Sequence, residues 1–312
     1  MKAVLIFNPG SGRGQGKERA DAFAASWLRR IGTRLQLRAT TSREDIGRAA
    51  LEVDQDAIPL FMGGDGTLSE GLNALASAGD FFQTIERPVG FLPGGTGNSF
   101  LRDFGIEDFA TGENRLLAAI EENCPRPCDA MGLTYLPDSC EDEIAPARRH
   151  LAINIWGLGL LATIAERAVT MRRFGAINYV LATLREVIGH VPSEARFRIN
   201  GGDWECLRFN LIALSNSQFT GGGMRIAPGV EIDDGELAWL RSNLAGKRAL
   251  LRAFLQVRHG NHSGQPGMEE RRVRRVEIEK GREPVLMNVD GEQLRGRALK
   301  VEVLPKCFRL YV

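Results

Sequence analysis

The 312-residue chain lacks any long apolar run. No segment approaches the roughly 20 apolar residues that a membrane-spanning helix needs, so the sequence does not predict a transmembrane protein. The apolar stretch at the N-terminus breaks at Asn8-Pro9-Gly10; it is too short for a signal-peptide core and has no small-residue cleavage site. This stretch favours a first β-strand, and the expected location is the cytoplasm.

The sequence also lacks a large net charge and a metal-binding cysteine pattern. Forty Lys and Arg residues against 39 Asp and Glu residues leave a formal net charge of +1. That balance disfavours a nucleic-acid-binding protein that relies on overall charge. The five cysteines include no Cys-x-x-Cys pair and are interpreted as free thiols. The composition, 43% hydrophobic and 25% charged, is typical of a folded globular protein.

Two common phosphate-binding motifs are absent as well. The Walker pattern fails because Ser11 stands where its first glycine is needed, and Glu18 follows Gly16-Lys17. The dinucleotide pattern fails because Gln15 occupies the position of its third glycine. The sequence therefore predicts neither a P-loop enzyme nor an ordinary dehydrogenase.

The first 125 residues alternate short apolar runs with helix-like stretches. This alternation predicts a parallel, doubly wound α/β sheet, which binds ligands beyond the carboxyl ends of its strands. The expected strands are Ala3–Phe7, Arg34–Arg38, Ile58–Met62 and Val89–Leu92, and the expected helices are Lys17–Arg30, Arg43–Val53, Leu68–Ala76 and Asn114–Glu122.

A domain boundary is expected at Cys124–Cys128, which holds two prolines in five residues. Beyond it the pattern favours strands, with one helical stretch at Leu160–Ile188, and so predicts a mainly antiparallel β-sandwich. The expected domains are 1–125 and 126–302, with 303–312 as a segment that could return to the first. The expected strands are Leu151–Ile155, Ala195–Ile199, Phe209–Leu214, Glu236–Leu240, Val273–Ile278, Val285–Val289 and Leu299–Leu304.

Four turns of the first domain each follow an expected strand, so a parallel sheet would bring them to one edge. They are Asn8–Gly12, Thr40-Thr41, Gly63–Thr67 and Pro93–Asn98. Glycine allows backbone N–H groups to approach phosphate oxygens closely, and a following helix adds its unpaired N–H groups. Hydroxyl groups of the threonines could donate further hydrogen bonds. Together the turns predict a cradle for a nucleotide polyphosphate.

These motifs resemble those of the diacylglycerol kinase catalytic-domain superfamily, which includes bacterial diacylglycerol kinases, sphingosine kinases and ceramide kinases. The run Gly63–Thr67, with Glu70, resembles the GGDGT motif of that group. Asn8–Gly12 resembles the first nucleotide loop of the family, and Pro93–Asn98 resembles its PxGTxN loop. Further along the chain, Gly221–Gly223 with Pro228 and Asp233–Gly235 resembles the GGG…P…DDG stretch. Asp290–Glu292 resembles the late DGE motif. The resemblance extends over nearly the whole chain.

The resemblance implies an ATP-dependent kinase that phosphorylates a hydroxyl group of a membrane lipid, with an α/β ATP-binding domain followed by a β-rich lipid-binding domain. Thr41 adjoins Thr40 and is the alternative to it as an ATP contact. The implied ATP contacts are Asn8, Pro9, Gly10, Ser11, Gly12, Thr40, Gly64, Asp65, Gly66, Thr67, Leu68, Ser69, Glu70 and Thr96, with Arg172 and Arg173 against the phosphates.

Phosphoryl transfer depends on charge neutralisation, so a divalent cation, Mg²⁺, is expected. The resemblance implies a structural Mg²⁺ held by Asp234 and by backbone carbonyls of Glu231 and Glu236; an ordinary Asp-Gly turn is the alternative. The resemblance also implies two candidates for the catalytic general base: Glu292, which matches the proton acceptor proposed in bacterial lipid kinases, and Asp65, which matches the residue favoured in sphingosine kinases. Glu292 is preferred, with Asp65 placing catalytic magnesium and the phosphates.

The acceptor is expected to be a neutral lipid such as diacylglycerol or ceramide. Sphingosine kinases carry an aspartate shortly after a Trp-Gly pair, whereas Trp156-Gly157 is followed here by no carboxylate up to Thr163. Peripheral contact with a membrane is expected, although the basic run Arg271–Arg275 favours a solvated strand face. A soluble NAD kinase and a non-catalytic nucleotide or lipid sensor are the alternatives; the oligomeric state is not predicted.

Overall fold

The computed structural model describes residues 1–79, 81–95, 98–138, 146–171, 178–221, 223–279, 281 and 283–312. The chain divides into two compact units. Unit 1 consists of Met1–Asp129 together with Pro305–Val312, and unit 2 consists of Ala130–Leu304. Two strands, β5 and β15, run from one unit into the other.

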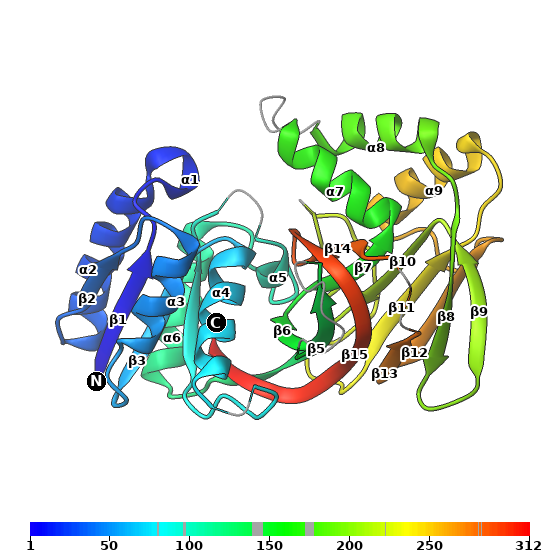
Figure 1. Ribbon diagram of the computed structural model, residues 1–312. Helices are drawn as coiled ribbons and strands as arrows, with labels where there is room; N and C mark the ends of the chain where they lie inside the picture. Colours follow the sequence, from blue (N-terminus) through cyan, green and yellow to red (C-terminus); the bar gives the residue numbers. More distant parts are fainter. Residues whose placement is uncertain are drawn as a thin grey trace. The chain divides into compact units, whose positions relative to one another are not determined.

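Unit 1 contains a parallel sheet in the strand order β2-β1-β3-β4-β15 (Figure 1). All four neighbouring pairs are parallel, which confirms the predicted parallel sheet. The carboxyl ends of β1, β2, β3 and β4 therefore lie along one edge. The strands are β1 Lys2–Phe7, β2 Gln36–Ala39, β3 Ala57–Gly63, β4 Val89–Pro93 and the last residues of β15 Glu292–Tyr311.

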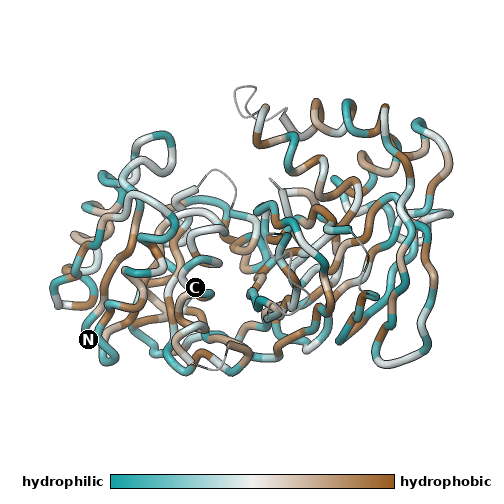
Figure 2. Tube along the Cα trace, in the orientation of Figure 1, coloured by the Kyte–Doolittle hydropathy of each residue, from teal (hydrophilic) through white to brown (hydrophobic). Residues whose placement is uncertain are grey.

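Helices cover both faces of this sheet. Alternate residues of β1, including Leu5 and Phe7, pack with Phe23 and Trp27 of α2 and with α6, while α3 and α4 contact each other. Because strand side chains alternate between faces, one apolar strand serves both helix layers. Figure 2 shows the resulting hydrophobic strands flanked by helices of mixed hydropathy. The helices are α1 Ser11–Gly14, α2 Gly16–Ile31, α3 Arg43–Leu51, α4 Asp65–Ser77, α5 Ser99–Arg102 and α6 Phe109–Glu121.

Unit 2 is rich in antiparallel strands, as the sequence predicts. One run has the order β12-β11-β10-β7-β14-β15, while β13 joins β15 to β8 and β9, and β5 pairs with β15 and β6. The strands are β5 Arg126–Pro137, β6 Arg148–Ala152, β7 Ile155–Gly159, β8 Ser193–Ile199, β9 Trp204–Phe209, β10 Leu211–Ser215, β11 Leu237–Ser242, β12 Met268–Val273, β13 Arg275–Ile278 and β14 Val285–Val289. The helices are α7 Leu160–Thr170, α8 Asn178–Gly189 and α9 Lys247–His259.

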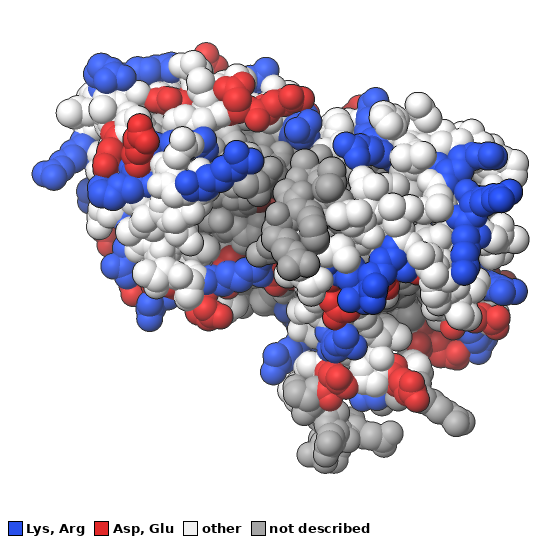
Figure 3. Space-filling model, turned by 90° about the horizontal axis from the view of Figure 1, so that it is seen from above, with Lys and Arg blue, Asp and Glu red and all other residues white. Residues whose placement is uncertain are grey.

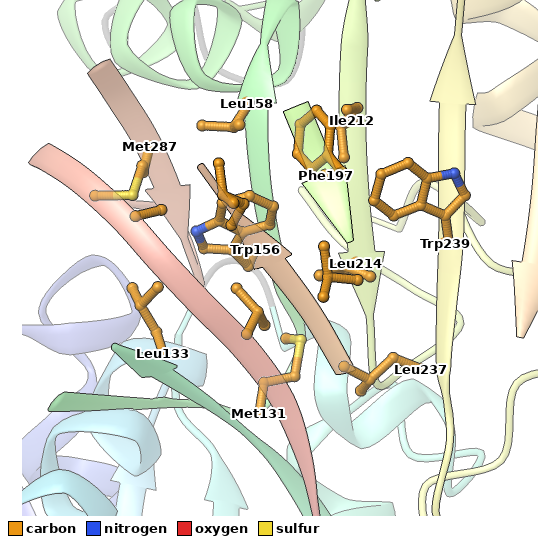
Figure 4. Packing of buried hydrophobic residues seen from close by; sticks show 14 of the residues in the cluster. Met131, Leu133, Trp156, Leu158, Phe197, Ile212, Leu214, Leu237, Trp239 and Met287 are labelled. Carbon is orange, nitrogen blue, oxygen red and sulfur yellow. The ribbon is translucent and has the colours of Figure 1, made fainter. Parts of the chain in front are cut away.

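The core of unit 2 lies between its strands and is built on aromatic side chains (Figure 4). Trp156, Phe197 and Trp239 are fully buried, and the rings of Phe197 and Trp239 meet edge to face with centroids 5.6 Å apart. Phe209 completes the cluster against Phe197. Such packing fixes β7, from which the following helix α7 begins.

Three predicted strands of unit 2 are wrong in their boundaries, since each covers a break. Leu151–Ile155 spans the end of β6 and the start of β7, Phe209–Leu214 spans β9 and β10, and Val273–Ile278 spans β12 and β13. Buried residues such as Ile153 continue the apolar pattern through the break, so periodicity does not mark it.

The helices of unit 2 also differ from the prediction. The single stretch Leu160–Ile188 is occupied by two helices, α7 and α8. The sequence reading missed α9 altogether, although its apolar residues recur at helical spacing. No helix in the described ranges combines the length and hydrophobicity required to cross a bilayer.

Candidate active site

The turn after β1 is held by its own first residue. Asn8 accepts a hydrogen bond on Oδ1 from the Gly10 N–H at 2.8 Å, and its carbonyl oxygen accepts one from Ser11 at 3.0 Å. Gly12 and Arg13 then adopt left-handed backbone conformations, with φ of 58° and 64°. Right-handed and left-handed residues in succession turn backbone N–H groups into a concave surface that suits an anion.

Close packing requires glycine where α2 begins behind this turn. A Cβ atom added to Gly16 would lie 2.2 Å from the carbonyl oxygen of Asn8. Any larger residue would therefore push the helix away from the turn. The sequence places Lys17 next, on the exposed side of α2, where it pairs with Asp21 at 3.0 Å rather than forming a Walker-type lysine.

The turn after β3 leads directly into α4. Gly63 has no room for a side chain, because a Cβ there would lie 2.1 Å from Oγ1 of Thr67. Thr67 donates its N–H to the Gly64 carbonyl at 2.8 Å, which closes the first turn of the helix. The 13-residue helix α4 thus presents its unpaired N–H groups and positive dipole end at the sheet edge. Leu68 and Ser69 are buried, so the ATP contacts predicted for them stay a prediction.

The turn after β4 is fastened to the turn after β3. Gly94 donates its N–H to the Gly63 carbonyl at 2.7 Å, and a Cβ on Gly95 would lie 2.6 Å from Cα of Gly64. The carboxylate of Asp65 accepts N–H bonds from Ser99 at 2.8 Å and from Phe100 at 3.1 Å. Asp65 therefore links the start of α4 to the start of α5.

The first turn meets the third one as well. A Cβ on Gly12 would lie 3.0 Å from the Gly94 carbonyl oxygen and 3.1 Å from a guanidinium nitrogen of Arg19. The third turn, Pro93–Gly95, consequently contacts both the first, Asn8–Gly12, and the second, Gly63–Thr67, at the edge that the sequence predicts. Their backbone N–H groups and the end of α4 can bind a polyanion.

Thr40 lies at the same sheet edge but its polar groups are engaged. Both its N–H and its hydroxyl donate to the carbonyl oxygen of Phe7, at 2.8 and 3.1 Å, and the residue is buried. The neighbouring Thr41 donates its N–H to Asp45 at 3.0 Å. Thr40 thus ties the end of β2 to the residue before the first turn, and its contact with ATP stays a prediction.

Charged side chains beside the second turn were only partly recognised from the sequence. Glu70 is half-buried, and desolvation raises its pKa; Arg43 opposes the rise and Glu44 adds to it. A Cβ on Gly66 would lie 3.2 Å from a guanidinium nitrogen of Arg43. Arg43 and Arg19 therefore adjoin the turns, yet sequence reasoning singled out neither. Their only signal was a position near the start of the helices that follow β2 and β1.

In unit 2, the late acidic motif forms a tight hairpin. Asp290 and Gly291 connect β14 to β15 with φ of 51° and 87°, the two positive values that a type I′ turn requires. The Asp290 carboxylate accepts N–H bonds from Ile153, Asn154 and Ile155 at 2.7 to 2.9 Å. The half-buried Glu292 begins β15 opposite Val289. The position of Glu292 is thus fixed by strand pairing and by the anchored turn beside it.

The acidic turn at residues 231–236 is a candidate metal site only in part. Asp234 accepts N–H bonds from Glu231 at 3.3 Å and Glu236 at 2.9 Å, and the Arg272 guanidinium lies 3.4 Å from its carboxylate. Arg272 also donates to the Gly229 carbonyl. Oxygen donors of this kind suit Mg²⁺, but a cation there would share Asp234 with a guanidinium. In the described ranges, this turn included, no three His, Cys, Asp or Glu side chains gather to hold an ion.

Three predicted site residues lie outside the described residues: Thr96, Arg172 and Arg173. The remaining nucleotide residues fall in the converging turns or along the same edge. The metal residues and Glu292 belong to unit 2. Four cysteines in the described ranges, Cys124, Cys128, Cys206 and Cys307, are free thiols.

Comparison with known families separates the chain into two matched parts. Residues 2–132 match the diacylglycerol kinase catalytic domain, and residues 155–312 match the YegS C-terminal NAD kinase beta sandwich-like domain. The second match alone covers half of the chain. It also identifies the β-rich unit, whose relation to NAD kinases the sequence motifs did not reveal.

Named relatives agree with these matches. The "Probable lipid kinase YegS-like" of Xanthomonas euvesicatoria is 27% identical over 300 residues, covering 93% of this chain and 90% of the relative. The diacylglycerol kinase of Bacillus subtilis is 27% identical over 302 residues, with coverage of 93% and 89%. A solved structure from Bacillus anthracis, assigned to the diacylglycerol kinases, superimposes with a TM-score of 0.75 at 22% identity, covering 99% of this chain and 94% of that one.

Membership of such a family defines the type of reaction. A diacylglycerol kinase catalytic domain belongs to phosphotransferases whose acceptor is an alcohol group, and ATP is the phosphate donor that a kinase family implies. The resemblance seen in the motifs is confirmed. The chain therefore belongs to the lipid kinase family that combines a diacylglycerol kinase catalytic domain with a YegS-type C-terminal domain.

Proposed function

We propose that the chain transfers the γ-phosphate of ATP to a hydroxyl group of a neutral membrane lipid of the diacylglycerol or ceramide type. The contact among the three glycine-rich turns of unit 1 supports this proposal most strongly. Gly63 and Gly95 lack room for a Cβ atom and Gly94 has little, so the backbones of the turns come close together there. The diacylglycerol kinase relative in Bacillus subtilis supports the acceptor class.

In this proposal the triphosphate lies on the three turns. Asn8–Gly12 and Gly64–Glu70 supply backbone N–H groups and the end of α4, and Thr40 and Thr96 flank them. Arg172 and Arg173 neutralise phosphate charge. Arg19 and Arg43, which adjoin the first and second turns, add positive charge on the described side chains. Positioning and neutralisation of this kind supply most of the catalysis in phosphoryl transfer.

We assign Glu292 as the general base that accepts the proton of the lipid hydroxyl as its oxygen bonds to the γ-phosphorus and the bond to ADP breaks. Asp65 is assigned a positioning role, because its carboxylate already accepts N–H bonds from Ser99 and Phe100. The fixed hairpin that carries Glu292 suits a group that must meet a reacting atom.

Magnesium is proposed as the divalent cation of the reaction. Asp234, with backbone carbonyls of Glu231 and Glu236, would hold one ion, which supplies positive charge when bound. Asp234→Asn is expected to raise the magnesium concentration needed for half-maximal turnover. Arg272→Gln, which removes the competing guanidinium from the same carboxylate, should lower it or leave it unchanged.

A neutral acceptor is supported by the first helix after the Trp156-Gly157 pair. The one acidic side chain of α7, Glu166, pairs with Arg295 at 3.0 Å. A cationic headgroup would therefore compete with an arginine for it. We further propose a cytoplasmic protein that contacts the membrane peripherally to reach this acceptor.

The decisive experiment compares acceptors with labelled ATP and magnesium. Diacylglycerol, ceramide, sphingosine, monoacylglycerol and NAD are each offered to the purified chain. Label in diacylglycerol or ceramide is expected. Label in NADP alone would replace the proposal with a soluble NAD kinase, and nucleotide binding without any transfer would indicate a sensor.

Glu292→Gln tests the assignment of the base. We expect turnover to fall about 100-fold or more, the usual effect of removing a general base, while ATP affinity by calorimetry stays close to that of the wild type. Asp65→Asn should instead weaken ATP binding, since the turns it joins would separate. A nearly normal turnover in Glu292→Gln, with a loss confined to Asp65→Asn, would transfer the role to Asp65.

A further inference from the structure

Exposed apolar side chains gather on one helical layer of unit 2. The two most exposed large apolar residues in the described ranges are Val191, at 76%, and Ile188, at 66%. Leu184 stands one turn before Ile188 on α8, and Leu255 is exposed on α9. Scattered exposed apolar residues need no explanation, but a group on neighbouring helices indicates an interaction surface.

The same helices also have buried apolar residues, on the sides opposite to the exposed ones. Val187 of α8 and Leu250 of α9 are buried together with Leu160 of α7. The three helices therefore form one layer over the strands of unit 2, and no described helix or strand of that unit covers their outer sides (Figure 1). Figure 2 shows hydrophobic segments along α8 interrupted by white and hydrophilic ones.

The same layer carries basic side chains that make no ion pair. Helix α9 contains Lys247, Arg248, Arg252, Arg258 and His259 but no Asp or Glu. The exposed residues Arg185, Lys247, Arg248 and Arg252 have no acidic partner in the part of the chain that the structure describes. Seen from above in Figure 3, the half of the molecule with these helices is mainly blue and white, with red groups toward its lower rim.

The other basic run of unit 2, Arg271–Arg275, has its arginines in ion pairs. Arg271 pairs with Glu269 at 2.5 Å, Arg272 with Asp234 at 3.4 Å, and Arg274 with Glu236 at 3.5 Å; Arg275 pairs with Glu277. These charges are already neutralised within the unit. Unlike that run, the helical layer combines unpaired positive charge with exposed apolar side chains.

From this combination we infer that the outer side of α8 and α9, with Val191, docks on a bilayer containing anionic lipids. An interfacial surface needs apolar side chains that enter the headgroup region and basic side chains that bind negative headgroups. A second copy of the chain is a poorer occupant, because a two-fold contact would place the same arginines against each other. The inference rests on the proposed lipid substrate and adds the surface by which the enzyme reaches it.

The test measures binding to vesicles of phosphatidylcholine alone and of phosphatidylcholine mixed with phosphatidylglycerol. The wild type should bind the mixed vesicles, and more weakly as salt rises. Arg248→Glu with Arg252→Glu should weaken this binding by about 30-fold or more, given roughly fivefold for each basic residue near an anionic surface. Ile188→Ser with Val191→Ser should weaken it about tenfold.

Matched control variants lie on unit 1. Leu28→Ser with Leu51→Ser removes two similarly exposed apolar side chains, and Arg29→Glu with Arg34→Glu reverses two exposed arginines. Both controls should bind vesicles as the wild type does. Thermal unfolding of each variant shows that it is folded.

A second readout separates docking from catalysis. Turnover of a short-chain diacylglycerol dispersed as single molecules should remain at the wild-type level in the α8 and α9 variants, while phosphorylation of vesicle lipid falls. Equal vesicle binding by variants and wild type would overturn the inference. The inference would also be overturned if the wild type formed a dimer and these variants dissociated that dimer while binding vesicles as the wild type does. Absence of lipid phosphorylation would count against the proposed function. The vesicle-binding assay would still test the docking surface, because it measures binding and does not depend on turnover.

Discussion

Asp65 and Asp290, like Asp234, act on backbone N–H groups. Asp65 collects the N–H groups of Ser99 and Phe100, and Asp290 collects those of Ile153, Asn154 and Ile155. An ionised carboxylate has two acceptor oxygens and can satisfy several donors at once. Part of each motif therefore holds its loops in place, and a motif residue need not touch the reacting atoms.

Asp290→Ala is predicted to lower the free energy of unfolding by about 3 kcal/mol, because three N–H groups of buried residues lose their acceptor at roughly 1 kcal/mol or more each. Alanine is also strained at the φ of 51° found here. Asp290→Asn should cost less, since asparagine tolerates that conformation and keeps one acceptor oxygen. Urea unfolding measures both variants.

The exposed Asp203 provides the control for this comparison. Asp203→Ala should change the free energy of unfolding by less than about 0.5 kcal/mol. An Asp290→Ala variant as stable as Asp203→Ala would show that the three hydrogen bonds contribute nothing.

At the level of elements, the geometry of the sheet edge where the glycine-rich turns meet depends on how closely neighbouring loops approach. Parallel pairing places β1, β3 and β4 side by side, so their turns leave the sheet together. Gly63 admits the side chain of Thr67, and Gly95 admits the backbone of Gly64. Each of these glycines makes room for an atom from a different part of the chain or from the following helix, which explains the glycine in the turns after β3 and β4.

Gly95→Ala is predicted to weaken ATP binding about tenfold or more. Its Cβ would lie 2.6 Å from Cα of Gly64, and a backbone atom gives way only if the whole turn moves, at a cost of about 1–3 kcal/mol. Gly79→Ala is the matched control, because no atom lies within 4 Å of its Cβ position. Calorimetric titration with ATP and magnesium compares the two; equal affinities would show that the turns can separate without loss.

At the scale of the whole molecule, the two ends of the chain build one unit. The last residues of β15 pair with β4, and Phe308, Leu310 and Tyr311 are buried in unit 1. The Tyr311 hydroxyl donates to Asn123 at 2.8 Å, and the Lys306 N–H donates to Asp129 at 2.7 Å. Unit 1 is therefore incomplete without residues 305–312.

Deletion of residues 305–312 is predicted to unfold unit 1. Removing three buried side chains costs at least about 5 kcal/mol, which is close to the whole stability of many domains. Binding of ATP should be lost and the protein should aggregate or become protease-sensitive. Deletion of Val312 alone should leave ATP binding intact, and a truncated chain that still binds ATP would refute the prediction.

Sequence reasoning was most reliable where a pattern has a direct physical cause. Ala3–Phe7 and Val89–Leu92 were found because buried parallel strands are continuously apolar, and the observed β1 and β4 differ from them by one residue. It was least reliable where burial overrides the pattern, as at Ile153, where an apolar residue occupies a break between strands. It also missed α9, whose function as an outer layer depends on the sheet beneath it.

The sequence by itself determined the alternation of strands and helices, the glycine-rich turns and the order of the motifs, because local conformation and side-chain chemistry suffice for these. Only the tertiary structure decided that the Thr40 hydroxyl donates a hydrogen bond to the Phe7 carbonyl oxygen. It also decided that Asp65 and Asp290 accept hydrogen bonds from backbone N–H groups, and that Arg43 adjoins Gly66. Each of those facts is a contact between residues distant in the chain. Such a contact depends on which strands pair and how closely their turns approach, and that is settled by packing across the whole unit.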